Sequence, residues 1–260
     1  MRGIRLLLFD LDGTLLTSDK TISERTMRSL MRCREMGIML GISTSRGERN
    51  AQVFTQKLKP EITISSGGAL VSCKGEYIFR AEFTAEETME IISTVRSICG
   101  EDCEITADTA DCHYWNYKTD PKAQDKSWGD SVYTDFSGFD KSTLKICAEI
   151  FDETQAAQLR DKLDHCDIIR FFDGFWYKLT KKGITKERAV PEICRALGIT
   201  PGEIAAFGDD LADIGMLRVC GTGVAMGNAL TEVKAAADIV IRSNDEDGIA
   251  EALEQLIVNN

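Results

Sequence analysis

The chain has 260 residues, of which 43% are apolar and 28% are charged, and its formal net charge at pH 7 is −11. These values are typical of a globular protein with a substantial buried core. They argue against two classes of partner. No apolar run reaches the roughly 18 residues that a membrane span needs, and so negative a chain repels nucleic acid.

The cysteine pattern and the N-terminus indicate a compartment. Nine cysteines stand at irregular spacings without a CxxC pair, and the chain has only two histidines. This pattern argues against a zinc site and favours reduced thiols packed as small apolar side chains, as in the cytoplasm. The N-terminal apolar run ends after about six residues in an aspartate pair, which is too short for a signal peptide.

Apolar runs alternate with amphipathic segments from the first residues onward. The uninterrupted runs predict buried strands at Ile4–Phe9, at Ile38–Ile42 and at 62–64. A helix is expected around 23–36, with Thr21 and Glu24 as its capping box. A second helix is expected to end near Pro60.

The same alternation returns toward the C-terminus. A predicted helix carries Ala189, Ile193 and Leu197 on its apolar face, and Gly198 is its stop signal. Further elements are predicted as strands at 204–208 and in "DIVIRS" (238–243), and as a helix near 247–257. Strands this apolar, alternating with helices, indicate a parallel sheet covered on both faces, so we expect a doubly wound α/β fold.

The middle of the chain differs in charge from its two ends. Residues 83–181 include 20 acidic and 11 basic side chains, a net charge of −9, whereas the rest has 22 acidic and 20 basic side chains, a net charge of −2. The shift predicts an inserted domain at 83–181, with 1–82 and 182–260 forming the other domain. The alternative is one continuous fold with an acidic face.

Polar side chains follow three of the predicted strands. They are Asp10 and Asp12, then residues 43–46, then Asp209, Asp210 and Asp213. The carboxyl ends of parallel strands share one edge of the sheet, where ligands bind. Carboxylates that converge there repel one another unless a cation holds them. Oxygen ligands without nearby histidine or cysteine favour Mg²⁺.

Four short motifs carry a resemblance to a known family. In chain order, "FDLDGTLL", "STSRG", "KGITKERAV" and "GDDLADIGML" resemble the four motifs of the haloacid dehalogenase superfamily phosphatases. "GVAMGNAL" and "VKAAADIV" look like the tail of its Cof-type branch, which has a large α/β cap inserted between the second and third motifs. The resemblance covers 1–82 and 182–260. It implies a doubly wound, Rossmann-like α/β core with 83–181 as the inserted cap domain.

The resemblance also implies an activity, the Mg²⁺-dependent hydrolysis of small phosphorylated metabolites such as sugar or cofactor phosphates. Asp10 would be the nucleophile that forms an aspartyl phosphate. Asp12 would protonate the leaving alcohol and then activate water. The implied metal ligands are Asp10, Asp12, Asp209 and Asp213. Asp213 would act either through a water molecule or by orienting Lys186.

The remaining candidates would bind the substrate. The Thr44 hydroxyl would donate a hydrogen bond to the transferring phosphoryl group, although Ser43 and Thr44 alone also suit a simple helix N-cap. Lys186 would place a compact positive charge on the phosphate oxygens. Further candidates for phosphate or substrate contact are Ser43, Arg46 and Asn228.

Two departures from the family pattern and the aromatic residues of the middle segment leave questions open. Ser45 stands where glycine is common, so it should crowd the loop slightly. Ala212 stands where asparagine is usual, which puts a phosphate or loop contact in doubt. "CHYWNYK" (112–118) and "FWYK" (175–178) either stack on a ring-bearing substrate or pack on the cap helices as alternating strand residues.

Two other functions compete with a phosphatase. A phosphomutase of the same superfamily would pass the phosphoryl group back to a sugar. A catalytically weak binding protein is disfavoured, because every reacting side chain of the four motifs is present. The sequence identifies no individual substrate, and we expect a monomer or a homodimer.

Overall fold

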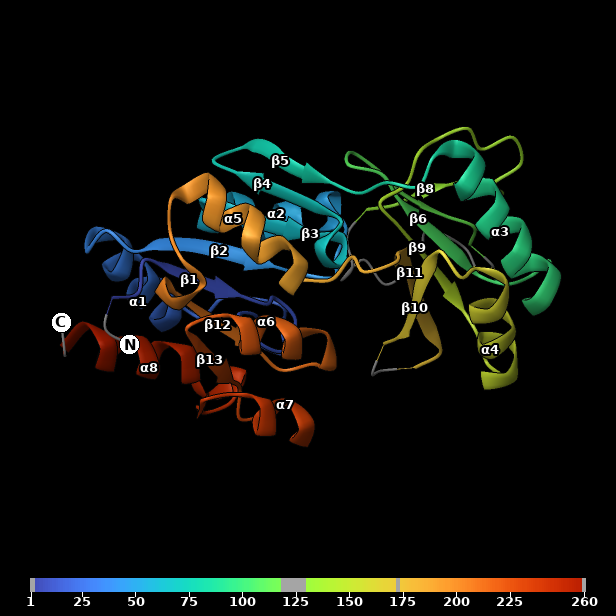
Figure 1. Ribbon diagram of the computed structural model, residues 1–260. Helices are drawn as coiled ribbons and strands as arrows, with labels where there is room; N and C mark the ends of the chain where they lie inside the picture. The colour runs from blue at the N-terminus through green and yellow to red at the C-terminus, as the bar shows by residue number, and fades with distance from the viewer. Residues whose placement is uncertain (1–2, 118–129, 172–173, 259–260) are drawn as a thin grey trace.

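The computed structural model describes residues 3–117, 130–171 and 174–258, and in it the chain forms two sheets (Figure 1). The first, the core sheet, runs in spatial order through β14 (Ile239–Val240), β13 (Thr222–Ala225), β12 (Ile204–Gly208), β1 (Leu6–Phe9), β2 (Met39–Ser43), β3 (Ile62–Ser65), β4 (Leu70–Cys73) and β5 (Glu76–Arg80). The second, the cap sheet, runs through β10 (Cys166–Arg170), β11 (Trp176–Lys181), β9 (Lys145–Glu149), β6 (Ile105–Asp108), β7 (His113–Trp115) and β8 (Val132–Tyr133).

The strands from β14 to β3 are parallel, as their apolar sequences predict. The expected α/β fold class is therefore confirmed. The edge of the sheet differs from the predicted parallel arrangement. There β4 and β5 form an antiparallel hairpin, and β4 pairs antiparallel with β3. Its tight turn lies at Lys74 and Gly75, which both have positive φ (52° and 87°). The alternation of strands and helices gave no signal for this hairpin.

Helices cover the core sheet and one face of the cap sheet. Those of the core are α1 (Glu24–Glu35), α2 (Glu48–Leu58), α5 (Val190–Leu197), α6 (Ile214–Val219), α7 (Thr231–Ala236) and α8 (Gly248–Val258). The cap sheet is covered by α3 (Ala85–Cys99) and α4 (Glu153–Lys162) (Figure 1). Short 3₁₀ turns are η1 (Ser66–Gly68), η4 (Glu187–Ala189), η5 (Pro201–Glu203), η6 (Leu211–Asp213) and η7 (Asn244–Glu246). No described helix is both long enough and apolar enough to cross a membrane.

The start of α1 corrects one prediction. Its N-cap is Ser23, whose side chain accepts a hydrogen bond from the Thr26 backbone N–H (3.1 Å). The predicted capping box of Thr21 and Glu24 is wrong, because the Thr21 hydroxyl instead bonds the Thr17 hydroxyl (3.0 Å). The N-cap is the residue at which the backbone turns into the helix. Thr21 and Ser23 both have the hydroxyl that suits an N-cap, and the sequence alone did not distinguish them.

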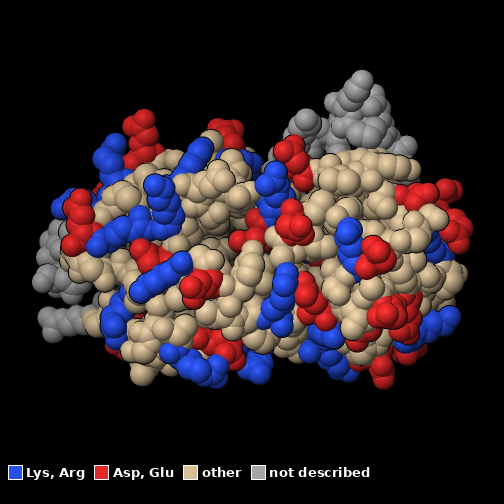
Figure 2. Space-filling model, turned by 90° about the horizontal axis from the view of Figure 1, so that it is seen from above, with Lys and Arg blue, Asp and Glu red and all other residues tan. Residues whose placement is uncertain are grey.

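Each sheet has its own apolar core. The core sheet is built around β1, whose four residues are fully buried among side chains of both sheet faces. A second cluster fills the space between the cap sheet and α3 and α4. All nine cysteines lie within the described residues as free thiols, which fits the expected reduced state. Acidic side chains gather at the end of the molecule where α3 and α4 lie (Figure 2).

Candidate active site

The core sheet brings the ends of distant segments together. β1 pairs in parallel with β12, so Phe9 lies opposite Phe207. The Asp10 backbone N–H then donates to the Phe207 carbonyl (3.0 Å), which fixes Asp10 at the carboxyl edge of the sheet. Asp209 follows directly after β12 at the same edge. Chain positions about 200 residues apart thereby meet because parallel strands end on the same side.

Three carboxylates form a buried cluster at this edge. One oxygen from each of Asp10, Asp209 and Asp213 lies within 4.8 Å of the others. Lys186, at the start of η4, enters the cluster with its amine 2.6 Å from Asp10 Oδ1 and 2.7 Å from Asp213 Oδ1. Only 3% of the Lys186 side chain is exposed. The second oxygen of Asp213 accepts the backbone N–H of Asp209 (3.1 Å), which ties the loop after β12 to the same group.

Burial and charge shift the pKa values of this cluster. Burial raises the pKa of Asp10 well above its usual range, more than the charge of Lys186 lowers it. Burial also raises the pKa of Asp209 to about 7, against a hydrogen bond from Thr14. Burial acts in the opposite direction on Lys186, but the charges of Asp10 and Asp213 outweigh it and raise its pKa. The raised pKa values of Asp10 and Asp209 mean that their charged forms are unfavourable in the cluster without a cation, and a divalent cation would favour those charged forms.

The loop after β1 positions Asp209. Its Oδ1 accepts a hydrogen bond from the Thr14 hydroxyl (2.6 Å). Gly13 makes this approach possible, since a Cβ on Gly13 would overlap the Asp209 carboxylate. The φ of Gly13 is +81°, a value that residues with a side chain rarely adopt. A side chain at this position would therefore be both strained and obstructed. The Asp-Gly-Thr sequence is needed here for the shape of the loop as well as for the aspartate.

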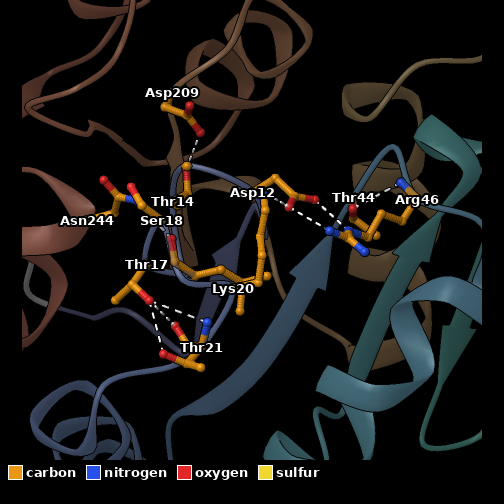
Figure 3. A network of polar contacts seen from close by, with 12 residues as sticks. Asp12, Thr14, Thr17, Ser18, Lys20, Thr21, Thr44, Arg46, Asp209 and Asn244 are labelled. Atoms are coloured by element: carbon orange, nitrogen blue, oxygen red, sulfur yellow. Dashed lines mark hydrogen bonds and ion pairs between the residues drawn. The ribbon is translucent and has the colours of Figure 1, made fainter. Parts of the chain in front are cut away.

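Asp12 does not join the carboxylate cluster. Its carboxylate turns toward Arg46 and away from Asp209, as Figure 3 shows. Arg46 binds it with two hydrogen bonds, Nε to Oδ2 (2.6 Å) and Nη2 to Oδ1 (2.8 Å), and Lys20 adds a third to Oδ1 (2.8 Å). Burial alone would raise the pKa of Asp12, but Arg46 and Lys20 outweigh it and hold the pKa below its usual value. Asp12 is therefore ionised in this arrangement.

The loop after β2 carries the other predicted phosphate ligands. Ser43 and Thr44 are buried, and the Thr44 hydroxyl accepts the Arg46 backbone N–H (3.1 Å). The Ser43 hydroxyl has no hydrogen-bond partner within the described part of the chain. Ser45, which departs from the family pattern, is half-buried and does not have a positive φ, so its backbone does not require glycine. Its backbone carbonyl accepts a hydrogen bond from the amine of Lys145 (2.8 Å), which comes from the cap sheet.

The remaining candidates have structural partners. The Asn228 amide donates to the Gly13 carbonyl (2.8 Å) and its oxygen accepts the Asn244 backbone N–H (3.1 Å), so this side chain braces the loop after β1. The side chain of Asp210 caps η6, accepting the N–H of Leu211 (2.7 Å). Ala212, within η6, offers no polar side chain.

Sequence reasoning missed the polar contacts that join the cap sheet to the loop after β2. Lys145 lies 2.7 Å from Asp108, whose other oxygen lies 2.5 Å from His113 Nδ1, and both Lys145 and Asp108 are buried. The signal was present in the sequence, because Lys145 and Lys178 interrupt apolar strand patterns. Alternation between the two sheet faces places such residues opposite the apolar core.

The aromatic residues of the cap divide between the two sheet faces. Tyr114 and Tyr177 contact the apolar cluster under α3 and α4, as expected for alternating strand residues. Trp115 and Trp176 lie on the opposite face, with their ring centroids 5.9 Å apart. Of the two predicted segments, Lys118 lies outside the described residues.

Comparisons with known proteins identify the family and the fold. The family model for haloacid dehalogenase-like hydrolases matches residues 7–253. A 5-amino-6-(5-phospho-D-ribitylamino)uracil phosphatase of Bacillus subtilis is 29% identical, over 96% of each chain. A pyridoxal phosphate phosphatase of Escherichia coli is 26% identical over 95% of this chain and 96% of its own. The solved structure of a sugar phosphatase of subclass IIB superposes with a TM-score of 0.84 at 26% identity, covering 97% of this chain and 98% of that one.

Proposed function

Since this chain belongs to the haloacid dehalogenase-like hydrolases, we propose that it is a magnesium-dependent phosphatase of small phosphorylated metabolites. One observation carries the proposal. The Lys186 amine lies between the carboxylates of Asp10 and Asp213, with Asp209 beside them. A nucleophilic carboxylate next to a fixed ammonium and a cation site is the arrangement that phosphoryl transfer to an aspartate requires. Relatives named for a phosphorylated uracil derivative and for pyridoxal phosphate support a small substrate.

The cation site is formed by the carboxylates of Asp10, Asp209 and Asp213. These are oxygen donors with no histidine or thiol among them, and magnesium binds such donors in preference to softer ones. The Mg²⁺ would neutralise charge on the phosphoryl oxygens as the two anions approach. Asp12, the fourth predicted ligand, keeps its carboxylate with Arg46 and Lys20, so we assign it to proton transfer.

In the first step, an oxygen of Asp10 attacks phosphorus and the bond from phosphorus to the ester oxygen breaks. Lys186 already donates to Oδ1 of Asp10 (2.6 Å), so Oδ2 is the oxygen we assign to the attack. Lys186 and the Thr44 hydroxyl hold the phosphoryl oxygens, and Ser43 lies next to them as a second hydroxyl. The departing alkoxide takes a proton from Asp12, and for this step Asp12 must first take up a proton from solvent and loosen its pair with Arg46.

In the second step, Asp12 removes a proton from water, which attacks phosphorus and releases phosphate from Asp10. The ion pair with Arg46 holds Asp12 in the charged form that this step needs. Arg46 thus acts on Asp12 in this arrangement, and a direct contact from Arg46 to substrate would require it to leave that pair. Asn228 supports the loop that carries both aspartates.

The proposal is tested by measuring phosphate released from a panel of phosphorylated metabolites, with Mg²⁺ and after exhaustive chelation. We expect turnover only with the metal, and we expect Asp10→Asn to abolish it while the protein stays folded. Full activity after chelation, or at least a tenth of wild-type activity in Asp10→Asn, would contradict the proposal. Isomerised sugar phosphate in excess of free phosphate would identify a mutase instead.

Two finer features belong to the same proposal. Nine free thiols suit a reducing compartment, so we place the enzyme in the cytoplasm. All the residues assigned here come from one chain, and the active form is a monomer or a homodimer. Size-exclusion chromatography with light scattering, run beside the activity assay, measures which form is active.

A further inference from the structure

The cap sheet has one apolar face and one polar face. Its apolar face packs on α3 and α4, and the opposite face looks toward the core sheet (Figure 1). Because strand residues alternate between faces, the neighbours of the apolar residues share this second face. Those that matter here are Asp108, Trp115, Lys145, Cys147, Lys178 and Thr180. Five of these six are buried although the face is polar.

This polar face meets the catalytic edge at two places. The Lys145 amine donates to the Ser45 carbonyl (2.8 Å), in the loop after β2. The Lys178 amine lies against Gly67 of η1, where a Cβ would come within 2.7 Å of its nitrogen. Gly67 in turn donates its N–H to the Thr44 carbonyl (3.0 Å). Gly67 therefore contacts both the Lys178 amine and Thr44, the predicted phosphate ligand.

Among the described residues, Lys178 differs from the other two buried lysines in having no ion-pair partner. Lys186 has two carboxylates and Lys145 has one, at 2.6–2.7 Å. Lys178 is only 4% exposed, and within the described residues no carboxylate lies within ion-pair distance of it. Burial, together with the charges of Lys186 and Lys145, lowers its pKa to about 8. A buried unpaired ammonium is costly, and an anion that enters the site would relieve that cost.

Two further buried polar atoms on the same face lack partners. In the described part of the chain, neither Trp115 Nε1 nor Thr180 Oγ1 makes a hydrogen bond. Thr180 is two residues after Lys178 on β11, and Trp115 packs edge-on against Trp176, two residues before it (5.9 Å). Both atoms are hydrogen-bond donors, like the Lys178 amine, and buried donors are normally satisfied. These two atoms lie on the same face as the Lys178 amine, an arrangement that suits a ligand with acceptor oxygens.

We propose that Lys178, on the polar face of the cap sheet, pairs with a second negatively charged group on the leaving group of the substrate. The substrate class is then a phosphate monoester that also carries a carboxylate or a second phosphate. This rests on the proposed phosphatase function and adds its substrate class. Lys178 is a specificity-determining residue, while the transferring phosphoryl group is held by Lys186 and Thr44.

Matched pairs of esters test the proposal by activity. One pair is 3-phosphoglycerate and glycerol 3-phosphate, which differ in a carboxylate, and the other is fructose 1,6-bisphosphate and fructose 6-phosphate, which differ in a phosphate. We expect the wild type to prefer the anionic member of at least one pair, and the pair identifies the anion. Lys178→Met should reduce that preference in kcat/KM by about 10- to 100-fold, the range of a charge-assisted hydrogen bond.

Two control variants separate this effect from others. Lys178→Arg keeps the charge and should retain most of the preference. Lys162→Met removes the same charge from the exposed end of α4 and should leave the preference unchanged. A wild type without preference in either pair would overturn the proposal. An equal loss in both members of a pair on Lys178→Met would also overturn it, because Lys178 would then act on the shared phosphoryl group.

Binding in the Asp10→Asn background tests the same point without turnover. Calorimetric titration of this variant should show at least about tenfold tighter binding of the preferred anionic ester than of its partner, and adding Lys178→Met should abolish the difference. Equal affinities in the Asp10→Asn protein would overturn the proposal. Failure of the phosphatase function shows separately, as wild-type protein that releases phosphate from no ester, and it does not alter the comparison of affinities.

Discussion

Replacing Lys186 with methionine perturbs the centre of the candidate active site. The amine pairs with both Asp10 (2.6 Å) and Asp213 (2.7 Å), and its side chain is 3% exposed. Methionine keeps much of the length and apolar stem but removes the charge. Two buried carboxylates then face each other without compensation, and Asp209 adds a third. We therefore expect Lys186→Met to destabilise the metal-free protein.

The size of the effect follows from the burial of the pair. Removing one partner of a buried ion pair costs about 3–5 kcal/mol. For a domain of about 150–250 residues, each kcal/mol shifts the unfolding midpoint by about 2–4 °C, so the midpoint should fall by roughly 6–20 °C. Asp10→Asn in the same background removes one of the orphaned charges and should recover part of the loss. A divalent cation should do the same by binding only the folded protein.

Thermal unfolding in chelator, and then in Mg²⁺, measures these shifts. Lys162→Met is the matched control, because it removes the same charge from an exposed helix end and should change the midpoint by no more than about 2 °C. A midpoint of Lys186→Met within about 2 °C of the wild type in chelator would refute the reasoning. No recovery on adding Asp10→Asn would show that the loss does not come from the orphaned carboxylate.

Two further variants test Asp209, which follows β12, and Asp12, in the loop after β1. Burial raises the pKa of Asp209 from 3.8 to about 7, so the folded chain holds a proton that the unfolded chain releases, and stability in chelator should fall as the pH rises from about 4 to 7. Asp209→Asn should flatten this fall and weaken Mg²⁺ binding, whereas an unchanged slope in thermal unfolding would contradict it. Arg46→Met removes the bidentate partner of Asp12, so the pKa of Asp12 should rise. The acidic limb of the plot of kcat against pH should then move to higher pH. An unmoved limb would show that Asp12 does not control it.

Much of this architecture was predictable from the sequence. Continuous apolar runs such as Ile4–Phe9 indicated buried parallel strands, because a strand covered on both faces needs no polar alternation. The four ordered motifs identified the family, which the match over residues 7–253 confirms. The inserted domain at 83–181 remains a prediction from charge and resemblance, and the presence of a separate cap sheet and apolar cluster supports it.

What could not be predicted depends on contacts between distant segments. The motif pattern indicated Asp12 and Arg46 as separate candidates, but their ion pair exists only because β1 and β2 end side by side. Likewise Lys20 reaches Asp12 from a turn with positive φ that no pattern indicated. Lys178 was visible as a lysine within a strand. Its lack of an ion-pair partner among the described residues is a property of the folded interface between the cap sheet and η1.

The central claim is that Asp10 carries the phosphoryl group between the two steps and that Asp12 moves the protons. Asp12→Asn separates the steps, because an aryl leaving group hardly needs an acid whereas the attacking water needs a base, a contribution of about 10²- to 10⁴-fold. Rapid quenching with an aryl phosphate should therefore show a burst of aryl alcohol close to one per active site. Mass spectrometry should then find a hydroxylamine-labile phosphoryl group on the peptide that contains Asp10. A missing burst, or phosphate on any other residue, would contradict the account.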